Sequence, residues 1–265
     1  LLAETDGARQ ESSCPGQRFS TWPLFRRSGV LGEPALVDSS ICGIYGARSP
    51  CSAKASQDKP SAPFSWFAAI FMVLLAGRVG QVVNLSALGG EVGVSTSTLS
   101  EWLSILEASF LVFRLQPCFS NISKRTVKSP KLYFTEVGLA SYLLGLESPL
   151  HVSRDPLRGN LFENLVVADA MKARLNRGKD PRLFFLRTEK GFEVDLIVRE
   201  GRALRPVEIK SAATFHPDFV SRLKRFCAEE PDAATPLLVY DGEGYADRSG
   251  VKCANFREDP FKEHE

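Results

Sequence analysis

The chain has 265 residues, of which 44% are hydrophobic and 24% are charged, and its formal net charge is +2. This composition is ordinary for a globular protein and excludes wholesale disorder and a chain made mainly of membrane spans. With so small a net charge, affinity for nucleic acid must come from a local basic patch. The 6 cysteines and 3 histidines include no Cys-x-x-Cys pair, so neither a zinc site nor a disulfide framework is predicted, and a reducing cytoplasmic location is expected.

The first 63 residues differ in composition from the rest of the chain. They are rich in Ser, Pro, Gly and Arg and lack a sustained apolar period, so residues 1–63 are expected to be disordered or a remnant, with no assigned role. The regular part is divided into residues 64–136, residues 137–257 and a tail at 258–265. The longest apolar run, 66–76, is shorter than the roughly 20 residues of a transmembrane helix, so a buried helix without membrane contact is predicted.

A helix-turn-helix pattern follows a helix predicted over residues 67–83. Gly93 suits a left-handed turn residue, and Ser95 can cap the helix that comes next. Two stretches of alternating polarity, 110–116 and 131–135, then predict a pair of strands. A helix-turn-helix with a strand pair predicts a winged-helix domain in this part of the chain.

The charges of the predicted winged helix bear on nucleic-acid binding. Its second helix would enter a DNA groove, yet no Arg or Lys occupies its exposed positions, which are Thr96, Ser97, Ser100 and Glu101. Basic residues instead follow the first predicted strand and precede a later helix, and these are the candidate phosphate contacts: Lys124, Arg125, Lys128, Lys131 and Arg158. A solvated loop, and a winged helix that serves only as a packing module between domains, are the alternatives.

Three strands are predicted over residues 183–186, 192–199 and 203–210, and the last two form a hairpin through Gly201 and Arg202. Glycine at the first central position suits a two-residue type II′ turn, which fixes the register of the two strands. That register places two apolar pairs on one face of the hairpin, which are Leu196 with Val207 and Val194 with Ile209. This face is the predicted core face.

The other face of the hairpin collects charged residues. In the same register Asp195 lies opposite Glu208, and Glu193 lies opposite Lys210. Two opposed carboxylates repel unless a cation lies between them, and Mg²⁺ prefers one or two carboxylates while it keeps several waters. The alternative is a polar outer face whose acids are balanced by Lys210 or Arg199.

Glu163 adds a third acid to this constellation. It lies in a helix predicted over residues 160–175, near the first turn, where the helix dipole favours a negative charge. With Asp195 and Glu208 it completes the predicted ligand set for Mg²⁺, or for Mn²⁺ as a substitute. The metal would activate water and polarise a phosphoryl oxygen, while Lys210 would orient the water or neutralise charge on the phosphate, so these four residues are the predicted catalytic set.

Seven short stretches resemble the C-terminal region of a large family of prokaryotic AAA-type ATPases, whose tail is a domain of unknown function. They lie at residues 75–81, 101–103, 128–134, 138–140, 156–159, 193–196 and 207–211. In that family the tail resembles a PD-(D/E)xK nuclease fold that follows a winged helix, and by that likeness the motif positions fall on Glu163, Asp195, Glu208 and Lys210. The resemblance implies an α/β fold, with a small winged helix before a mixed sheet flanked by helices.

The ATPase half of that family begins with a phosphate-binding loop, and this chain has no Gly-x-x-x-x-Gly-Lys-Ser/Thr sequence. ATP binding is therefore not implied, and the chain is expected to be a truncated relative. The resulting prediction is a nucleic-acid-interacting protein with a metal-dependent site for phosphodiester hydrolysis. The alternative is a non-catalytic docking module that serves an ATPase or another protein partner. The oligomeric state, and DNA versus RNA as substrate, stay open.

Overall fold

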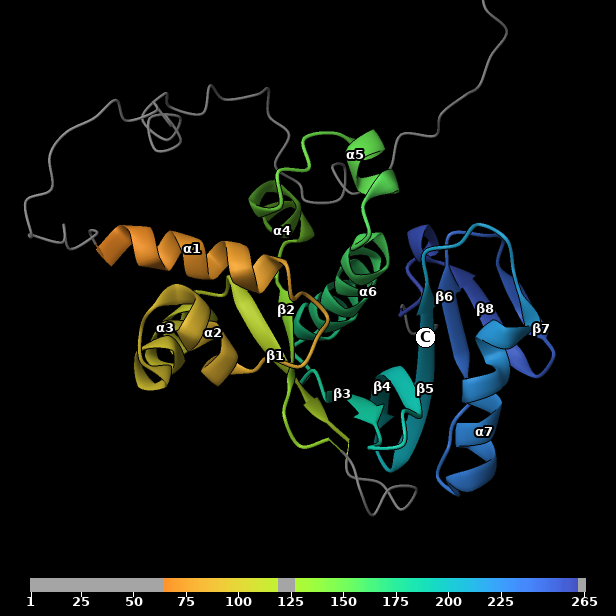
Figure 1. Ribbon diagram of the computed structural model, residues 1–265. Helices are drawn as coiled ribbons and strands as arrows, with labels where there is room; N and C mark the ends of the chain where they lie inside the picture. Colours follow the sequence, from red (N-terminus) through yellow and green to blue (C-terminus); the bar gives the residue numbers. More distant parts are fainter. Residues whose placement is uncertain (1–63, 119–126, 262–265) are drawn as a thin grey trace, which may run out of the picture.

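Eight strands form one mixed sheet in the order β2-β1-β3-β4-β5-β6-β8-β7 in the computed structural model, which describes residues 64–118 and 127–261 (Figure 1). The strands are β1 (Val112–Pro117), β2 (Lys131–Phe134), β3 (Leu183–Arg187), β4 (Glu193–Glu200), β5 (Ala203–Lys210), β6 (Leu237–Tyr240), β7 (Tyr245–Arg248) and β8 (Val251–Asn255). The predicted α/β class is confirmed. The winged-helix and nuclease-like types stay predictions.

Seven α-helices accompany the sheet in the described part of the chain. They are α1 (Phe64–Ala76), α2 (Leu85–Val92), α3 (Thr96–Ala108), α4 (Val137–Leu143), α5 (Pro149–Arg154), α6 (Arg158–Leu175) and α7 (Ser221–Glu229), with 3-10 helices η3 (Pro217–Val220) and η4 (Phe256–Glu258). Figure 1 shows α1, α2 and α3 gathered beside β1 and β2, and α7 beside the strands at the other end of the sheet. No helix among the described residues is long and apolar enough to cross a membrane.

The helix-turn-helix pattern is present as α2 and α3. Asn84 accepts hydrogen bonds from two backbone amides at the start of α2, and Gly93 ends that helix with a φ of 80° in the left-handed region. Ser95 then caps α3 by accepting a hydrogen bond from the Thr98 amide. The predicted roles of Gly93 and Ser95 are confirmed, because both depend only on local backbone chemistry.

The predicted strand pair also forms, and it belongs to the large sheet. β1 and β2 are antiparallel, with Val112 opposite Phe134. β1 also pairs in parallel with β3, through Gln116 opposite Phe184. The sheet is therefore continuous from the helix-turn-helix part to the C-terminal strands.

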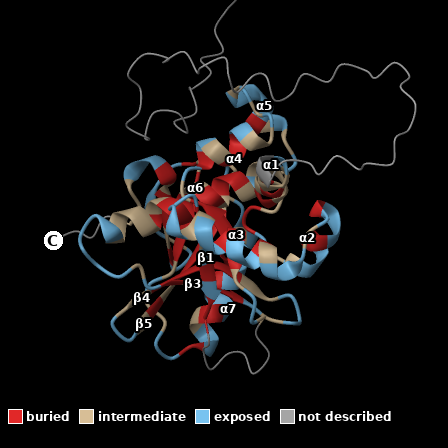
Figure 2. Cartoon of the chain, turned by 90° about the vertical axis from the view of Figure 1, so that its left-hand side faces the viewer, coloured by how far each residue is buried: buried red, intermediate tan, exposed pale blue. Residues whose placement is uncertain are grey.

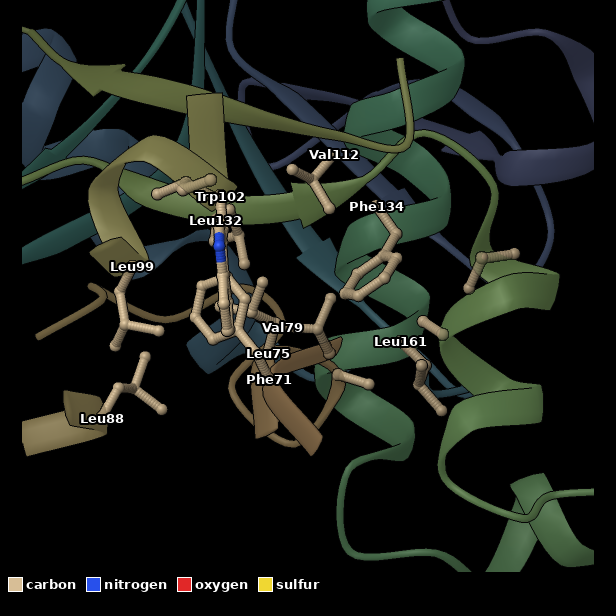
Figure 3. Packing of buried hydrophobic residues seen from close by; sticks show 14 of the residues in the cluster. Phe71, Leu75, Val79, Leu88, Leu99, Trp102, Val112, Leu132, Phe134 and Leu161 are labelled. Carbon is tan, nitrogen blue, oxygen red and sulfur yellow. The ribbon is translucent and has the colours of Figure 1, made fainter. Parts of the chain in front are cut away.

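One hydrophobic cluster joins α1–α4 to β1, β2 and the start of α6. Phe71, Leu75 and Val79 lie against Trp102 from α3, with the Phe71 and Trp102 ring centroids 5.9 Å apart, and Leu161 reaches the cluster from α6 (Figure 3). The apolar run predicted to be a buried helix thus forms α1 and supplies part of this core. α1 ends at Ala76, earlier than the predicted 83.

Helices cover the two faces of the sheet differently. Phe162 and Val166 of α6 pack with Leu196 and Val207 on one face, and Phe226 of α7 packs with other strand residues on the opposite face. In Figure 2 buried residues line β1, β3 and α6, whereas α2 and α3 turn one side to solvent. α6 therefore lies between the sheet and the N-terminal helices, and its residues reach both.

The hairpin register is confirmed over part of its length. Leu196 lies opposite Val207, and the pairing continues to the turn, where Gly201 has a φ of 63°. Beyond Leu196, however, β4 carries one extra residue relative to β3, so Val194 packs on the α7 face while Ile209 packs on the α6 face. The predicted Val194–Ile209 face was wrong because a β-bulge reverses the alternation of side chains.

Candidate functional site

Four carboxylates gather where β4 and β5 part from each other. We refer to Glu163, Glu193, Asp195 and Glu208 as the acidic cluster. The bulge in β4 lies beside Asp195, and the Asp195 Oδ2 atom accepts a hydrogen bond of 2.9 Å from the Ile209 amide. The carboxylate thus takes a position between the two strands, at the end of the paired part of the hairpin.

Lys131 neutralises one half of the acidic cluster. It is the first residue of β2, and only 3% of its side chain is exposed. Its Nζ atom lies 3.0 Å from Glu163 Oε1 and 2.8 Å from Glu193 Oε1. Burial lowers the pKa of Lys131, but the charges of Glu163 and then Glu193 outweigh burial, and the net pKa is raised. Lys131 is therefore a permanent internal cation.

The position of Glu163 differs from the prediction in one respect. α6 begins at Arg158, so Glu163 lies in the second turn of the helix and the dipole at the helix start does not explain it. Its Oε1 atom accepts hydrogen bonds from Lys131 Nζ and, at 2.6 Å, from the Tyr133 hydroxyl. Burial raises the pKa of Glu163 against the opposing charge of Lys131.

Lys210 neutralises the other half of the acidic cluster. Its Nζ atom donates to Glu208 Oε1 at 2.6 Å and lies 3.6 Å from Asp195 Oδ2. Arg222 of α7 adds a longer contact to Glu208, at 3.6 Å. The predicted association of Asp195, Glu208 and Lys210 is therefore present, although the bulge rather than a flat cross-strand pair brings these groups together.

Glu208 is the more deeply buried acid of this half. Only 2% of its side chain is exposed, and its Oε2 atom is buried with no hydrogen-bond partner among the described residues. Burial and the charge of Asp195 raise the pKa of Glu208 from 4.5 to about 7, although Lys210 and Arg222 act in the opposite direction. An unsatisfied buried carboxylate oxygen is costly, so this atom favours a proton or a cation beside it.

A pocket of about 750 Å³ opens beside the acidic cluster. Its charged lining residues are the acids Glu163, Glu189, Glu193 and Asp195 and the cations Lys131 and Arg187. Gly80 forms part of the wall, where its φ of 70° keeps the chain close to Asn160 and Glu163. The excess of acids means that the pocket repels an anionic ligand unless an additional cation enters with it.

The residues predicted to contact nucleic acid are not brought together. Lys124 and Arg125 lie outside the described residues, and Lys128 is exposed. Lys131 begins β2, within the strand predicted over residues 131–135, and its ammonium is enclosed by acids. Arg158 opens α6, and its Nη2 atom donates to the backbone oxygen of Ser211, which ties the helix to the end of β5.

The donor set fits a two-carboxylate site better than the three-carboxylate site that was predicted. Within the described ranges, no group of three or more His, Cys, Asp or Glu side chains could hold a metal ion. Glu163 is engaged by Lys131 and Tyr133, whereas Glu208 Oε2 has no partner and the Asp195 charge acts on the Glu208 carboxyl. Mg²⁺ is commonly bound by one or two carboxylates plus waters, so Asp195 and Glu208 fit its requirements without Glu163.

Three residues that contribute to the site were not predicted from the sequence. Tyr133 shares a strand face with Lys131 by the two-residue period, and that signal would have found it. Asn164 is fully buried and exchanges two hydrogen bonds with the backbone of Phe134, which fixes α6 against β2. Arg222 reaches Glu208 from α7 and has no short-range sequence signal.

The chain is similar to two domains of unknown function. Residues 68–150 match the one described as DUF8612, and residues 158–257 match the one described as DUF4143. Uncharacterized proteins of Mycobacterium bovis and Mycobacterium tuberculosis are each 32% identical to the chain over 170 residues, which cover 64% of the chain and 37% of each relative. The chain thus matches little more than a third of the length of these relatives. No solved structure matches it significantly.

Proposed function

We propose that this protein interacts with nucleic acid and carries a divalent-metal-dependent site for phosphodiester hydrolysis at Asp195, Glu208 and Lys210. The observation that carries the proposal is the convergence of two carboxylates on the Lys210 ammonium while Glu208 Oε2 stays buried without a partner. The resemblance to PD-(D/E)xK nuclease folds, at these same residues, supports the assignment.

Each of the three residues has a separate task in this proposal. Asp195 and Glu208 hold Mg²⁺, or Mn²⁺ in its place, and the Ile209 amide keeps the Asp195 carboxylate oriented. Lys210 neutralises negative charge on the phosphate. When bound, the metal polarises a phosphoryl oxygen and lowers the pKa of a water molecule.

Lys131, Tyr133 and Glu163 have a positioning role in the same proposal. Lys131 offsets part of the negative charge of Glu163 and Glu193, so that these acids repel the phosphate less strongly. The acid-rich pocket favours metal dependence for the same reason, because a phosphodiester can approach only with a cation that offsets the remaining carboxylates.

The test is cleavage of labelled single-stranded and double-stranded DNA and RNA with Mg²⁺ or Mn²⁺. The wild-type chain is expected to cleave at least one substrate, and Asp195→Asn is expected to abolish cleavage because it removes one of two metal ligands. Asp232→Asn, a change at an exposed residue, is the matched control and should cleave like the wild type. Cleavage that survives Asp195→Asn would refute this assignment.

A second candidate function is a non-catalytic docking module of an ATPase-associated system. It is favoured by the ion pairs of the cluster, because each of its acids has a lysine ammonium within 4 Å. It is also favoured by the exposed polar face of α3, which carries no Arg or Lys. Calorimetric titration with Mg²⁺ separates the two functions, because only the hydrolytic one requires metal binding that Glu208→Ala removes.

A further inference from the structure

A second pocket lies at the opposite end of α6 from the acidic cluster. It has a volume of about 400 Å³ and is lined by the last turns of α6, by strands of the sheet and by the chain after η4. Arg174 is eleven residues beyond Glu163, a separation of about 16 Å along a helix axis. This basic pocket is therefore separate from the proposed hydrolytic site.

The pocket is strongly cationic. Four of its lining residues are basic and one is acidic, namely Arg174, Arg177, Arg205 and Lys252 against Glu200. Glu200 pairs with Arg205 through the Nη2 atom at 3.1 Å. The other three cations have no carboxylate partner in any ion pair among the described residues. The pocket thus has an excess of positive charge inside a concave surface, where a bound anion is favoured.

The guanidinium groups in the pocket are held in place by hydrogen bonds, but they have further N–H groups that can donate to a ligand. Arg174 Nε donates to the Asp180 backbone oxygen at 3.1 Å, and Arg177 Nη1 donates to the Phe261 backbone oxygen at 3.2 Å. Each guanidinium has further N–H groups beyond that one bond. Arg205 Nε is buried and has no hydrogen-bond partner in the described part of the chain, which is costly unless a ligand accepts from it.

The arrangement of the sheet explains why these cations meet. Leu183 lies opposite Val198, and Val198 lies opposite Arg205, so the three side chains form one row across β3, β4 and β5 on the α6 face. The last turn of α6, with Arg174, and Arg177 just beyond it line the same pocket as this row. The negative end of the helix dipole accounts for basic residues on α6 itself. It does not account for Arg205 and Lys252, which come from strands.

We infer that the basic pocket binds a phosphate group, with apolar atoms of the same ligand against Leu183, Val198 and Phe261. Guanidinium groups match phosphate oxygens with paired N–H donors, and the pocket size suits a small organic phosphate. Such a group could belong to a free nucleotide-like molecule or to a nucleic-acid backbone. The inference does not depend on the proposed hydrolytic site.

The experiment measures calorimetric binding of pyrophosphate and of a short single-stranded oligonucleotide to the full chain in buffer with EDTA. Saturable binding is expected, and Arg174→Gln/Arg177→Gln is expected to weaken it about tenfold or more. The charge-matched control Arg154→Gln/Lys224→Gln, at exposed residues outside the pocket, should bind like the wild type. Lys252→Gln gives a milder second variant in case the double variant folds poorly.

The outcomes separate the two sources and the two sites. If pyrophosphate binds more tightly than the oligonucleotide, the ligand of the pocket is a free phosphate compound. If the oligonucleotide binds more tightly and pyrophosphate displaces it, the ligand is a nucleic-acid backbone. Asp195→Asn should leave either affinity unchanged, so failure of the hydrolytic proposal would not affect this result. Absence of saturable binding by both probes, or equal affinity in wild type, Lys252→Gln and the folded double variant, would overturn the inference.

Discussion

Lys131 Nζ lies 3.0 Å from Glu163 Oε1 although the two residues are 32 positions apart in the chain. We expect Lys131→Met to lower the free energy of unfolding by about 3 kcal/mol, because it leaves Glu163 and Glu193 without their shared buried cation. Urea denaturation at pH 7 measures the change. Lys128→Met, at an exposed position, is the control and should stay within about 0.5 kcal/mol of the wild type. If Lys131→Met has the same free energy of unfolding as the wild type, this ion pair does not stabilise the acidic cluster.

Glu208 is expected to make the chain less stable as the pH rises. Its pKa in the folded chain is about 7 against an ordinary 4.5, so between these values the native state holds a proton that the unfolded state has released. The free energy of unfolding should therefore fall across this window, with a contribution from Glu208 of roughly 2–3 kcal/mol. Urea titrations at pH 4.5, 6 and 8 measure it.

The matched variants for this pH dependence are Glu208→Gln and Glu147→Gln. Glu208→Gln should reduce the slope without abolishing it, because burial also raises the pKa of Glu163. Glu147 is exposed, and its replacement should leave the slope as it is. A wild-type slope of the opposite sign in this window would contradict a Glu208 carboxyl that binds its proton more tightly in the folded chain.

Asn164 holds α6 against β2, and this contact positions Glu163 beside Lys131. Asn164→Leu is expected to lower the free energy of unfolding by about 2–4 kcal/mol, since it leaves the buried amide and carbonyl of Phe134 without their partners. Asn176→Leu, at the exposed end of the same helix, should change stability by about 0.5 kcal/mol or less. Chemical denaturation of both variants makes the comparison, and equal stabilities would contradict the assigned role.

Replacing two glycines of the helix-turn-helix with alanine is expected to change stability in opposite directions. An added Cβ meets no atom within 4 Å at either Gly90 or Gly93, but only Gly93 has a positive φ. Gly93→Ala should destabilise the chain by about 1 kcal/mol or more through backbone strain, and Gly90→Ala should stabilise it by about 0.5–1 kcal/mol through helix propensity. Melting temperatures that shift in opposite directions are the expected readout. Shifts of the same sign would argue against the left-handed turn.

Local patterns predicted much of the secondary structure. The helix that became α6, the strand pair β1–β2 and the hairpin β4–β5 follow from apolar periods of 3.6 and 2, and the turn at Gly201 fixed the Leu196–Val207 register. These features depend on neighbouring residues, so the sequence contains their cause. The assignments of a winged helix and a nuclease-like domain depend on the assembly of such elements and stay predictions.

Where the sequence reasoning was wrong, a long-range contact was the reason. The pairing of β4 with β3 shifts by one residue beside Asp195, whereas the pairing of β4 with β5 keeps one register as far as Leu196. The bulge therefore arises from the contact with β3, and no property of the hairpin alone predicts it. Lys131 was predicted as a phosphate contact, yet the start of β2 places it between acids from α6 and β4. Both outcomes depend on which element lies next to which.

The sequence by itself determined that acids and a lysine would meet at the β4–β5 hairpin, because alternation and turn chemistry act over a few residues. Only the tertiary structure decided how those acids are neutralised. Parallel pairing of β1 with β3 brings β2 and Lys131 close to Glu163, and burial under α6 and α7 removes the water that would otherwise screen the charges. Burial, with Asp195 nearby, therefore raised the pKa of Glu208, and Lys131 and Tyr133 came to donate hydrogen bonds to the Glu163 carboxylate.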